Sequence, residues 1–318
     1  MTDLAEAQPE LDFEQHRIEL TAHCYRMLGS ATEADDAVQE TMIRAWRSVD
    51  RFEGRSSVRS WLYSIATNVC LDMLRGRKRR ATPMDLQAPS TADDRHLATL
   101  PESAWLQPMP DGRVLRDEGD PAELAIARDS VRLAFVAALQ HLPARQRAVL
   151  LLRDVLRWQA SEVAELLDTS TAAVNSALQR ARATLAEIDL SRAQEPTDAE
   201  EQELLAKYVD AFERYDVEAL VALMHEDARM AMPPFALWIR GAVEIGRWFV
   251  GMGAECRGSM LVPVAANGAP GFAQYRDGGR TPWAIQIPTF RDGRLASIDL
   301  FIGEEHFLRF GLPLDLTV

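Results

Sequence analysis

Cysteine is scarce in this sequence of 318 residues, which has only Cys24, Cys70 and Cys256. No two of them have the close C-x-x-C spacing that is typical of zinc sites and redox pairs. We therefore expect three reduced thiols, with no metal and no other cofactor.

Long apolar runs are also absent, because no stretch approaches the ~20 uninterrupted apolar residues that a membrane helix needs. The opening residues, MTDLAEAQPELDFEQ, are acidic, unlike the start of a signal peptide. We expect a cytoplasmic chain that has no membrane partner.

An overall positive charge, common in proteins that bind nucleic acid, is absent as well, since the net charge is -13. The total hides an uneven distribution. Residues 44–80 hold ten basic and three acidic residues, residues 81–127 three and nine, residues 128–187 eight and six, and residues 188–318 twelve and twenty. Polyanion binding is therefore expected only in the first half of the chain.

The length predicts two or three modules. Residues 13–80 form the first, because apolar residues recur at three-and-four spacing from Ala34 to Trp46 and a second helical pattern covers residues 58–75. The second helix ends in the basic cluster RGRKRR. Residues 1–12 are read as a tail.

Residues 81–121 are predicted to be an acidic linker rather than a packed element, since they contain six prolines and no sustained periodicity. Within this linker the island Trp105-Leu106-Gln107-Pro108-Met109-Pro110 is apolar. A tryptophan in a linker usually docks against another surface, so we expect Trp105 and Leu106 to act as an anchor.

Residues 122–190 are predicted to be helical and to end in a helix-turn-helix. Ser161 begins one helix, Asp168 and Thr169 turn the chain, and Ser170 is placed to N-cap the next helix. An ordinary helical hairpin with a solvated face is an equally good reading of this segment alone.

Residues 197–318 are predicted to be a separate α+β domain. Two helical patterns, residues 200–215 and 217–224, precede five short strand-like runs, and Asp292-Gly293 predicts a hairpin between the last two. We expect a curved antiparallel sheet.

Three motifs resemble the extracytoplasmic-function class of bacterial sigma factors. They are ADDAVQETMIRAW, RFEGRSSVRSWLYSIATNVCLDMLRGRKRR and LQHLPARQRAVLLLRDVLRWQASEVAELLDTSTAAVNSALQRARATL. The C-terminal part, with LVALMHEDARMAMPP and a W-x-I-Q-I-P-x-F strand, resembles the cone-shaped SnoaL-like polyketide cyclases. The whole is then two all-α sigma modules, joined by the linker, plus an α+β SnoaL-like domain.

This resemblance implies partners and site residues for the first module. Its partners would be core RNA polymerase and promoter DNA, both double-stranded and melted. Residues implied to dock on polymerase are Asp35, Asp36, Gln39, Glu40 and Arg44. Residues implied to melt and read the proximal promoter element are Phe52, Arg55, Ser57, Trp61, Tyr63, Asn68, Asp72, Arg75 and Arg79. Aromatic faces and cations suit extruded bases. Trp61 and Trp46 could instead be core, and for Trp46 we favour that reading.

The second module would place its recognition helix in the major groove of the distal promoter element. The residues expected on its DNA-facing side are Thr171, Asn175, Ser176, Gln179, Arg180 and Arg182. Asparagine and glutamine suit base edges, while arginine suits phosphate or guanine. Members of the family often have a basic residue near Asn175 and a glycine near Asp168, so the promoter sequence stays open.

The C-terminal domain could hold a ligand pocket, for which His225, Asp227, Tyr275 and Asp299 are candidates. A polar turn at His225 and a core filled by Met230, Trp238, Trp248 and Trp283 are the simpler readings. We expect no catalysis and an intramolecular contact with the sigma modules or linker that regulates them. A DNA-tethered ligand sensor or cyclase-type enzyme is the alternative.

Overall fold

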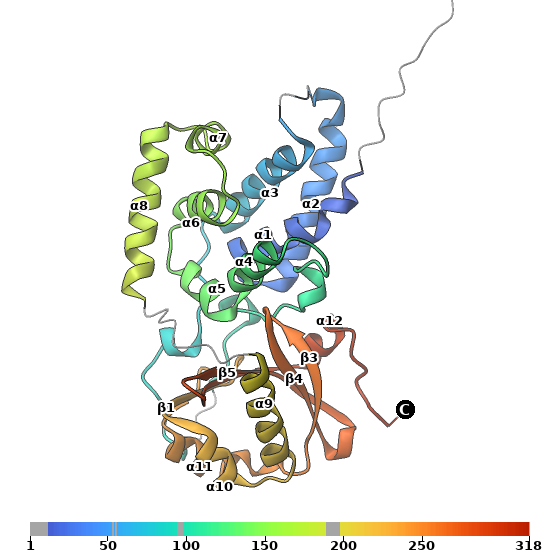
Figure 1. Ribbon diagram of the computed structural model, residues 1–318, viewed down its shortest axis with the longest axis vertical. Helices are drawn as coiled ribbons and strands as arrows, with labels where there is room; N and C mark the ends of the chain where they lie inside the picture. The colour runs from blue at the N-terminus through green and yellow to red at the C-terminus, as the bar shows by residue number, and fades with distance from the viewer. Residues whose placement is uncertain (1–11, 53, 55, 94–97, 189–197, 318) are drawn as a thin grey trace, which may run out of the picture.

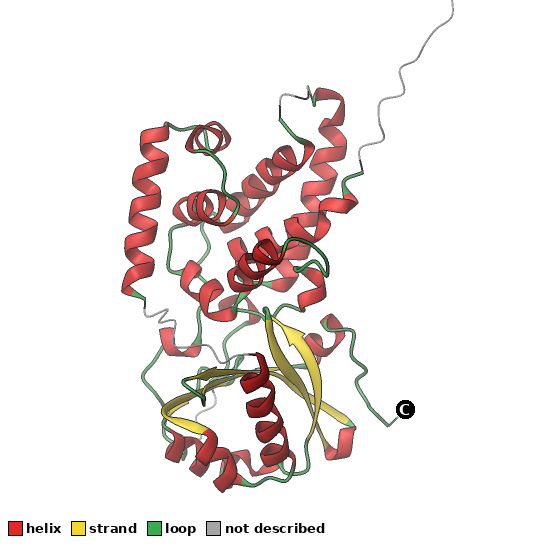
Figure 2. Cartoon of the chain, viewed as in Figure 1, coloured by secondary structure: helices red, strands yellow, loops and turns green. Residues whose placement is uncertain are grey.

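The computed structural model describes residues 12–52, 54, 56–93, 98–188 and 198–317. Helices α1 to α8 form one part of the molecule, and the sheet with helices α9 to α12 forms the other (Figure 1). Among the described residues, strands occur only in the second part, apart from isolated bridges made by the connecting segment (residues 81–93 and 98–120) (Figure 2). Within the described residues, no helix is both long enough and apolar enough to cross a membrane.

The first module consists of α1 (Arg17–Leu28), α2 (Ala31–Ser48) and α3 (Val58–Leu74). Gly29 ends α1 in the left-handed conformation, with φ of 67°, and the Ser30 hydroxyl then accepts the Glu33 amide to cap α2. Ser57 caps α3 in the same way. The three helices pack against one another around a common apolar interior.

Five helices follow the connecting segment: α4 (Pro121–Val131), α5 (Leu133–Gln140), α6 (Ala144–Leu150), α7 (Ala160–Leu166) and α8 (Thr171–Glu187). Asp168 has φ of 46° in the turn after α7, and Ser170 accepts the Ala173 amide. Both features agree with the predicted turn and N-cap.

One hydrophobic core is shared by the two helical modules, because buried residues of α1, α2 and α3 pack with buried residues of α5, α6 and α8. Two buried arginines cross the boundary. Arg147 on α6 donates to the Met27 carbonyl at the end of α1, and Arg26 donates to the Ser130 hydroxyl at 2.6 Å. The modules are therefore in a closed arrangement, since burial of guanidinium groups requires such partners.

The connecting segment is packed against its neighbours at several buried positions, so the prediction of an unpacked linker is wrong. Trp105 and Leu106 are 3% and 4% exposed. Leu106 lies so close to Gly29 that a Cβ there would be 2.7 Å from a Leu106 methyl. The Gln107 amide donates to the Gly29 carbonyl, and the Trp105 indole donates to Leu100. The prolines exclude regular helix here but not burial.

The C-terminal domain has a six-stranded sheet in the order β2-β1-β6-β5-β4-β3. The strands are β1 (Met224–Ala231), β2 (Trp238–Arg240), β3 (Met260–Ala266), β4 (Ala269–Arg276), β5 (Thr281–Arg291) and β6 (Arg294–Ile302). Strands β1 and β6 pair in parallel, so the sheet is mixed rather than wholly antiparallel. The Asp292-Gly293 turn joins β5 and β6, as predicted.

Helices α9 (Asp198–Glu213), α10 (Val217–Leu223) and α11 (Ala242–Val250) cover one face of the sheet. Helix α12 (Glu304–Arg309) packs against the other face, where Phe307 meets Tyr275. Strand β2 and helices α11 and α12 were not predicted. Strand β2 and helix α12 are short, whereas α11 has an amphipathic pattern, with Ile245, Trp248 and Phe249 buried, that was missed.

Candidate nucleic-acid interface

All five predicted docking residues lie on the side of α2 that faces away from the core. Gln39 and Asp36 are exposed, and Asp35, Glu40 and Arg44 are partly exposed. Arg44 donates to Glu40 at 2.6 Å and lies 3.5 Å from Asp72 on α3. Asp35 accepts from Arg113 of the connecting segment at 2.5 Å. One end of this face is thus engaged within the chain.

Trp46 belongs to the same exposed side, and the preference for a core position is wrong. Its side chain is 60% exposed, with one ring edge against buried Phe13 at 5.1 Å between centroids. Ile43, 37% exposed, lies one turn earlier. Two large apolar side chains beside polar docking residues form a surface of the kind that protein partners cover.

The loop after α2 brings Phe52 against Trp61 of α3, with ring centroids 4.9 Å apart. Ser57 is the N-cap of α3, and Asn68, further along the same helix, is exposed. Arg55 lies outside the described residues. Phe52 and Trp61 are partly exposed, and Asn68 is exposed.

Tyr63 is not at the surface, contrary to its predicted role. Its ring is 1% exposed and contacts Trp158 of the second module, at 6.2 Å between centroids. Burial raises the pKa of its hydroxyl well above the ordinary value. In the closed arrangement this ring cannot stack on a base.

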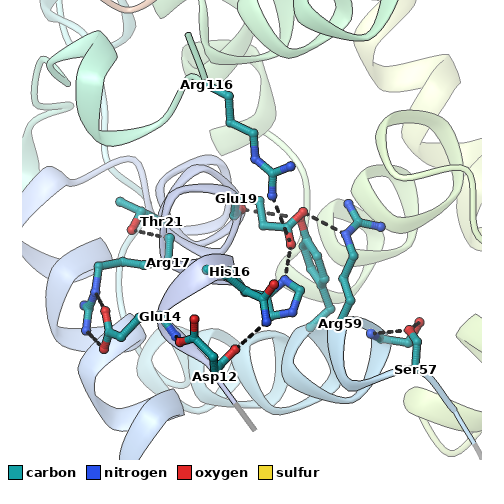
Figure 3. Close-up of polar contacts among 12 residues, drawn as sticks. Asp12, Glu14, His16, Arg17, Glu19, Thr21, Ser57, Arg59 and Arg116 are labelled. Atoms are coloured by element: carbon teal, nitrogen blue, oxygen red, sulfur yellow. Dashed lines mark hydrogen bonds and ion pairs between the residues drawn. The ribbon is translucent and has the colours of Figure 1, made fainter. Parts of the chain in front are cut away.

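Glu19 is the centre of a polar cluster (Figure 3), and the Tyr63 hydroxyl lies 3.5 Å from its carboxylate. Its carboxylate accepts from Arg59 at 2.7 Å, contacts His16 at 2.6 Å and lies 3.6 Å from Arg116 of the connecting segment. The cluster joins α1, the start of α3 and the connecting segment. The Arg59 guanidinium also lies over the Tyr63 ring, 5.1 Å from its centroid, although the residue remains exposed.

The end of α3 and the residues after it carry the basic cluster Arg75 to Arg80. Arg75 is exposed and paired with Asp72 on its own helix at 3.0 Å. Arg80 is buried, where it donates to the carbonyls of Glu102 and Trp105. Arg79 is exposed and donates to His141 of the second module. The acidic residues paired with this cluster come from α2, α3 and the connecting segment.

Helices α7 and α8 form the helix-turn-helix, and α8 exposes the predicted DNA-facing side. The residues exposed there are Thr171, Asn175, Ser176, Gln179, Arg180 and Arg182. Val174, Leu178 and Ala181 are buried on the opposite side. Arg182 makes two hydrogen bonds to Asp154, at 2.6 and 2.9 Å, so it is already partly oriented.

The four candidate pocket residues of the C-terminal domain are not brought together. His225 and Asp227 lie in β1, where exposed Asp227 pairs with Arg240 at 2.8 Å. The Tyr275 hydroxyl donates to the Pro313 carbonyl behind α12. Asp299 lines a small cavity between β6 and the connecting segment.

Asp299 is the candidate pocket residue with a strongly altered acidity. Burial raises the pKa of its carboxyl to about 6, while the positive charge of Arg229 acts in the opposite direction. The other residues lining the cavity are Ala81, Thr82, Pro83, Leu106, Leu133, Pro233 and Phe301. Asp299 therefore belongs to the boundary between modules, not to the inside of the cone.

The inside of the cone holds polar side chains that bond to one another. Tyr208 donates to Gln286 at 2.6 Å, Gln286 donates to Gln274 at 2.6 Å, and Gln274 donates to Ser259 at 2.9 Å. Met230, Trp238 and Trp248 are buried, as the core reading predicts, whereas Trp283 is only partly buried. These polar groups are satisfied within the fold.

Asn267, which was not among the predicted residues, contacts three parts of the chain. It lies in the turn between β3 and β4, and its side-chain amide donates to Tyr25 at 2.7 Å and to the Val131 carbonyl at 2.9 Å. Its oxygen accepts the Met109 amide at 3.0 Å. The Asn-Gly pair at Asn267-Gly268 is a turn signal that marks this position in the sequence.

Comparisons with known proteins agree with this division of the chain. The Sigma-70 region 2 family matches residues 13–80, the Sigma-70 region 4 family matches residues 132–185, and the SnoaL-like domain family matches residues 205–298. The ECF RNA polymerase sigma factor SigG of Mycobacterium tuberculosis is 46% identical over 307 residues, which cover 94% of this chain and 82% of SigG.

SigJ of the same organism is 27% identical over 305 residues, covering 90% of this chain and 89% of SigJ. The crystal structure of SigJ superposes with a TM-score of 0.62 at 25% identity, covering 95% of this chain and 99% of SigJ. Two sigma-70 regions, the second a helix-turn-helix, define a transcription initiation factor of the sigma-70 type. The chain belongs to the extracytoplasmic-function (ECF) family of RNA polymerase sigma factors and carries a SnoaL-like C-terminal domain.

Proposed function

We propose that the chain binds core RNA polymerase through the exposed side of α2, opens promoter DNA with α3 and reads the distal promoter element with α8. The presence of all three surfaces in one chain of this family carries the proposal. Exposed Asn175 and Gln179 suit base edges, and the exposed cations Arg75 and Arg79 suit phosphates.

Reconstituted transcription tests this function. Core polymerase with the full chain should give specific transcripts from members of a diverse library of two-element promoters. A matched reaction with the Asp36→Lys and Gln39→Ala variant should give few transcripts, because both changes alter the proposed docking side of α2. Both residues are exposed, so the fold should stay intact. If no library member supports a transcript with the unmodified chain, the proposal is wrong.

We further propose that the C-terminal domain regulates the sigma modules in cis by holding them closed. Asn267 supports this, since one side chain bonds to the first module, the connecting segment and α4. Arg309 of α12 also donates to Thr32 at 2.5 Å, beside the first turn of the docking helix. A domain that binds the closed state better than the open state shifts the population toward the closed state.

The closed state is proposed to be the inactive one. Tyr63 is buried against Trp158, and Asp35 is engaged by Arg113. Both residues belong to the surfaces proposed for promoter DNA and polymerase. The C-terminal domain is proposed to act without catalysis, because its interior polar side chains, Tyr208, Gln286 and Gln274, bond to one another.

A further inference from the structure

Among the described residues, the ion pairs of the basic cluster that ends α3 are made with α2, α3 and the connecting segment, not with the acidic C-terminal domain. Arg77 and Arg80 pair with Glu33 of α2. Arg79 instead reaches across to Asp85 of the connecting segment and His141 of the second module. Arg79 is thus the residue through which the cluster contacts both the connecting segment and the second module.

The three side chains form a bridge between the modules. The Arg79 guanidinium donates to Nδ1 of His141 at 2.6 Å, and Nε2 of His141 lies 3.0 Å from the Asp85 carboxylate. Arg79 is also 3.6 Å from the same carboxylate oxygen. A neutral imidazole with its proton on Nε2 satisfies both contacts.

The Asp85 carboxylate is held in this bridge by several hydrogen bonds. Its second oxygen accepts the Thr82 amide at 2.7 Å and the Thr82 hydroxyl at 2.8 Å, so the carboxylate is fixed in place. Only 15% of its side chain is exposed, compared with 43% for Arg79. An oxygen anion held by a backbone amide, a hydroxyl and two cationic or ring nitrogens has the contacts that a DNA phosphate makes on proteins.

We propose that Asp85 is an internal substitute for a DNA phosphate, occupying Arg79 in the closed arrangement until duplex DNA displaces it. The proposal rests on the DNA-binding role suggested above for the end of α3. It adds that the connecting segment competes directly with DNA, and that the same carboxylate ties the end of α3 to the second module through His141.

The test measures binding of the full-length protein, without polymerase, to a short labelled duplex of arbitrary sequence, by fluorescence anisotropy across a salt series. Asp85→Asn should tighten binding about fivefold, because Arg79 is released to bind a phosphate. The slope of log affinity against log salt should steepen by about 0.9, the value for one further phosphate contact.

Asp93→Asn is the matched control. Asp93 lies in the same connecting segment, and its change removes the same single charge, but it pairs with Arg247 on α11 at 3.1 Å. It should leave duplex affinity nearly unchanged. Equal tightening by Asp85→Asn and Asp93→Asn would mean a general charge effect and overturn the proposal.

Arg79→Gln completes the cycle. It should weaken duplex binding on its own and abolish the gain from Asp85→Asn in the double variant. A gain that persists without Arg79 overturns the phosphate substitute but leaves the DNA role of α3 standing. No effect of Arg79→Gln alone contradicts both.

His141→Ala gives a second route if Asp85→Asn unfolds. It keeps the Thr82 contacts of Asp85 and removes the bridge to the second module, so it should also tighten duplex binding. Thermal melts of each variant identify those that are folded. Folded His141→Ala protein with unchanged duplex affinity would overturn the proposed bridge.

Discussion

The amide of Asn267 lies 2.7 Å from the hydroxyl of Tyr25, and this hydrogen bond joins the C-terminal domain to the first sigma module. The Tyr25 hydroxyl in turn donates to the Gln107 carbonyl at 2.8 Å. The turn residue, the first helix and the connecting segment are therefore linked by consecutive hydrogen bonds in a buried position, where losing one partner leaves the others unsatisfied.

Asn267→Gly should loosen the closed arrangement and raise affinity for core polymerase by about threefold to tenfold, because the closed state competes with binding. Glycine is the informative replacement, since Asn267 has φ of 56° and alanine would add strain. Asp292→Gly, at φ of 52° in the β5–β6 turn, is the matched control and should not change affinity. Reduced polymerase affinity for Asn267→Gly would mean that the closed state assists assembly.

Trp46→Ala should weaken polymerase binding about tenfold while changing the free energy of unfolding little, because the ring is mostly exposed and large aromatic side chains dominate interfaces. Val243→Ala is the control, since Val243 is 71% exposed on α11 of the C-terminal domain. Titration of labelled chain with core polymerase measures the affinity. A large loss of stability in Trp46→Ala would instead favour a structural role.

Asn175→Ala and Gln179→Ala should change base preference at the distal promoter element, each by about 1–3 kcal/mol at one base pair. Arg75→Ala should weaken opening of all promoters similarly, because phosphate contacts carry no base information. Selection from a randomised distal element, read by sequencing, separates the two effects. An unchanged preference in both α8 variants would exclude this side of the helix as the reading surface.

Asp299→Asn should raise the free energy of unfolding at pH 7 by about 1–3 kcal/mol, because burial disfavours the charged carboxyl. The ordinary Asp pKa is about 4. Between that value and about 6, the folded chain holds a proton that the unfolded chain has released. Stability from this group therefore falls as pH rises through that window.

Denaturant titration at pH 5 and pH 7 checks this sign. The difference between Asp299→Asn and the unmodified chain should grow toward pH 7. Asp227→Asn in β1 removes an exposed ion pair and should change stability by less than about 1 kcal/mol at either pH. A stabilisation of Asp299→Asn that is equal at both pH values would contradict a raised carboxyl pKa.

Local patterns in the sequence predicted most of the helices, strand β1 and the strands from β3 to β6. Ser170 caps α8 as expected because capping depends on residues close in the chain. Strand β2 was missed because it has three residues and gains its partners from far away, including a bridge from Ser90 to Ile239. Packing of the connecting segment depends on the same long-range contacts.

The sequence predicted which helices hold the candidate site residues, but it did not predict whether each of these side chains is exposed. Trp46 comes four residues after buried Met42, so helical spacing alone placed it beside the apolar side. Tyr63 is buried by Trp158, a residue nearly a hundred positions away, and no local pattern reports that contact. The turn at Asn267 was detectable as an Asn-Gly pair, but its partners were not.

The single core shared by the two helical modules should affect the heat-capacity change of polymerase binding. Opening the closed arrangement returns apolar side chains such as Leu139 and Val149 to water, which raises the heat capacity, whereas docking on polymerase buries apolar surface and lowers it. The two changes partly cancel in calorimetric titrations at several temperatures. Asn267→Gly, already loosened, should therefore bind with a more negative heat-capacity change than the unmodified chain.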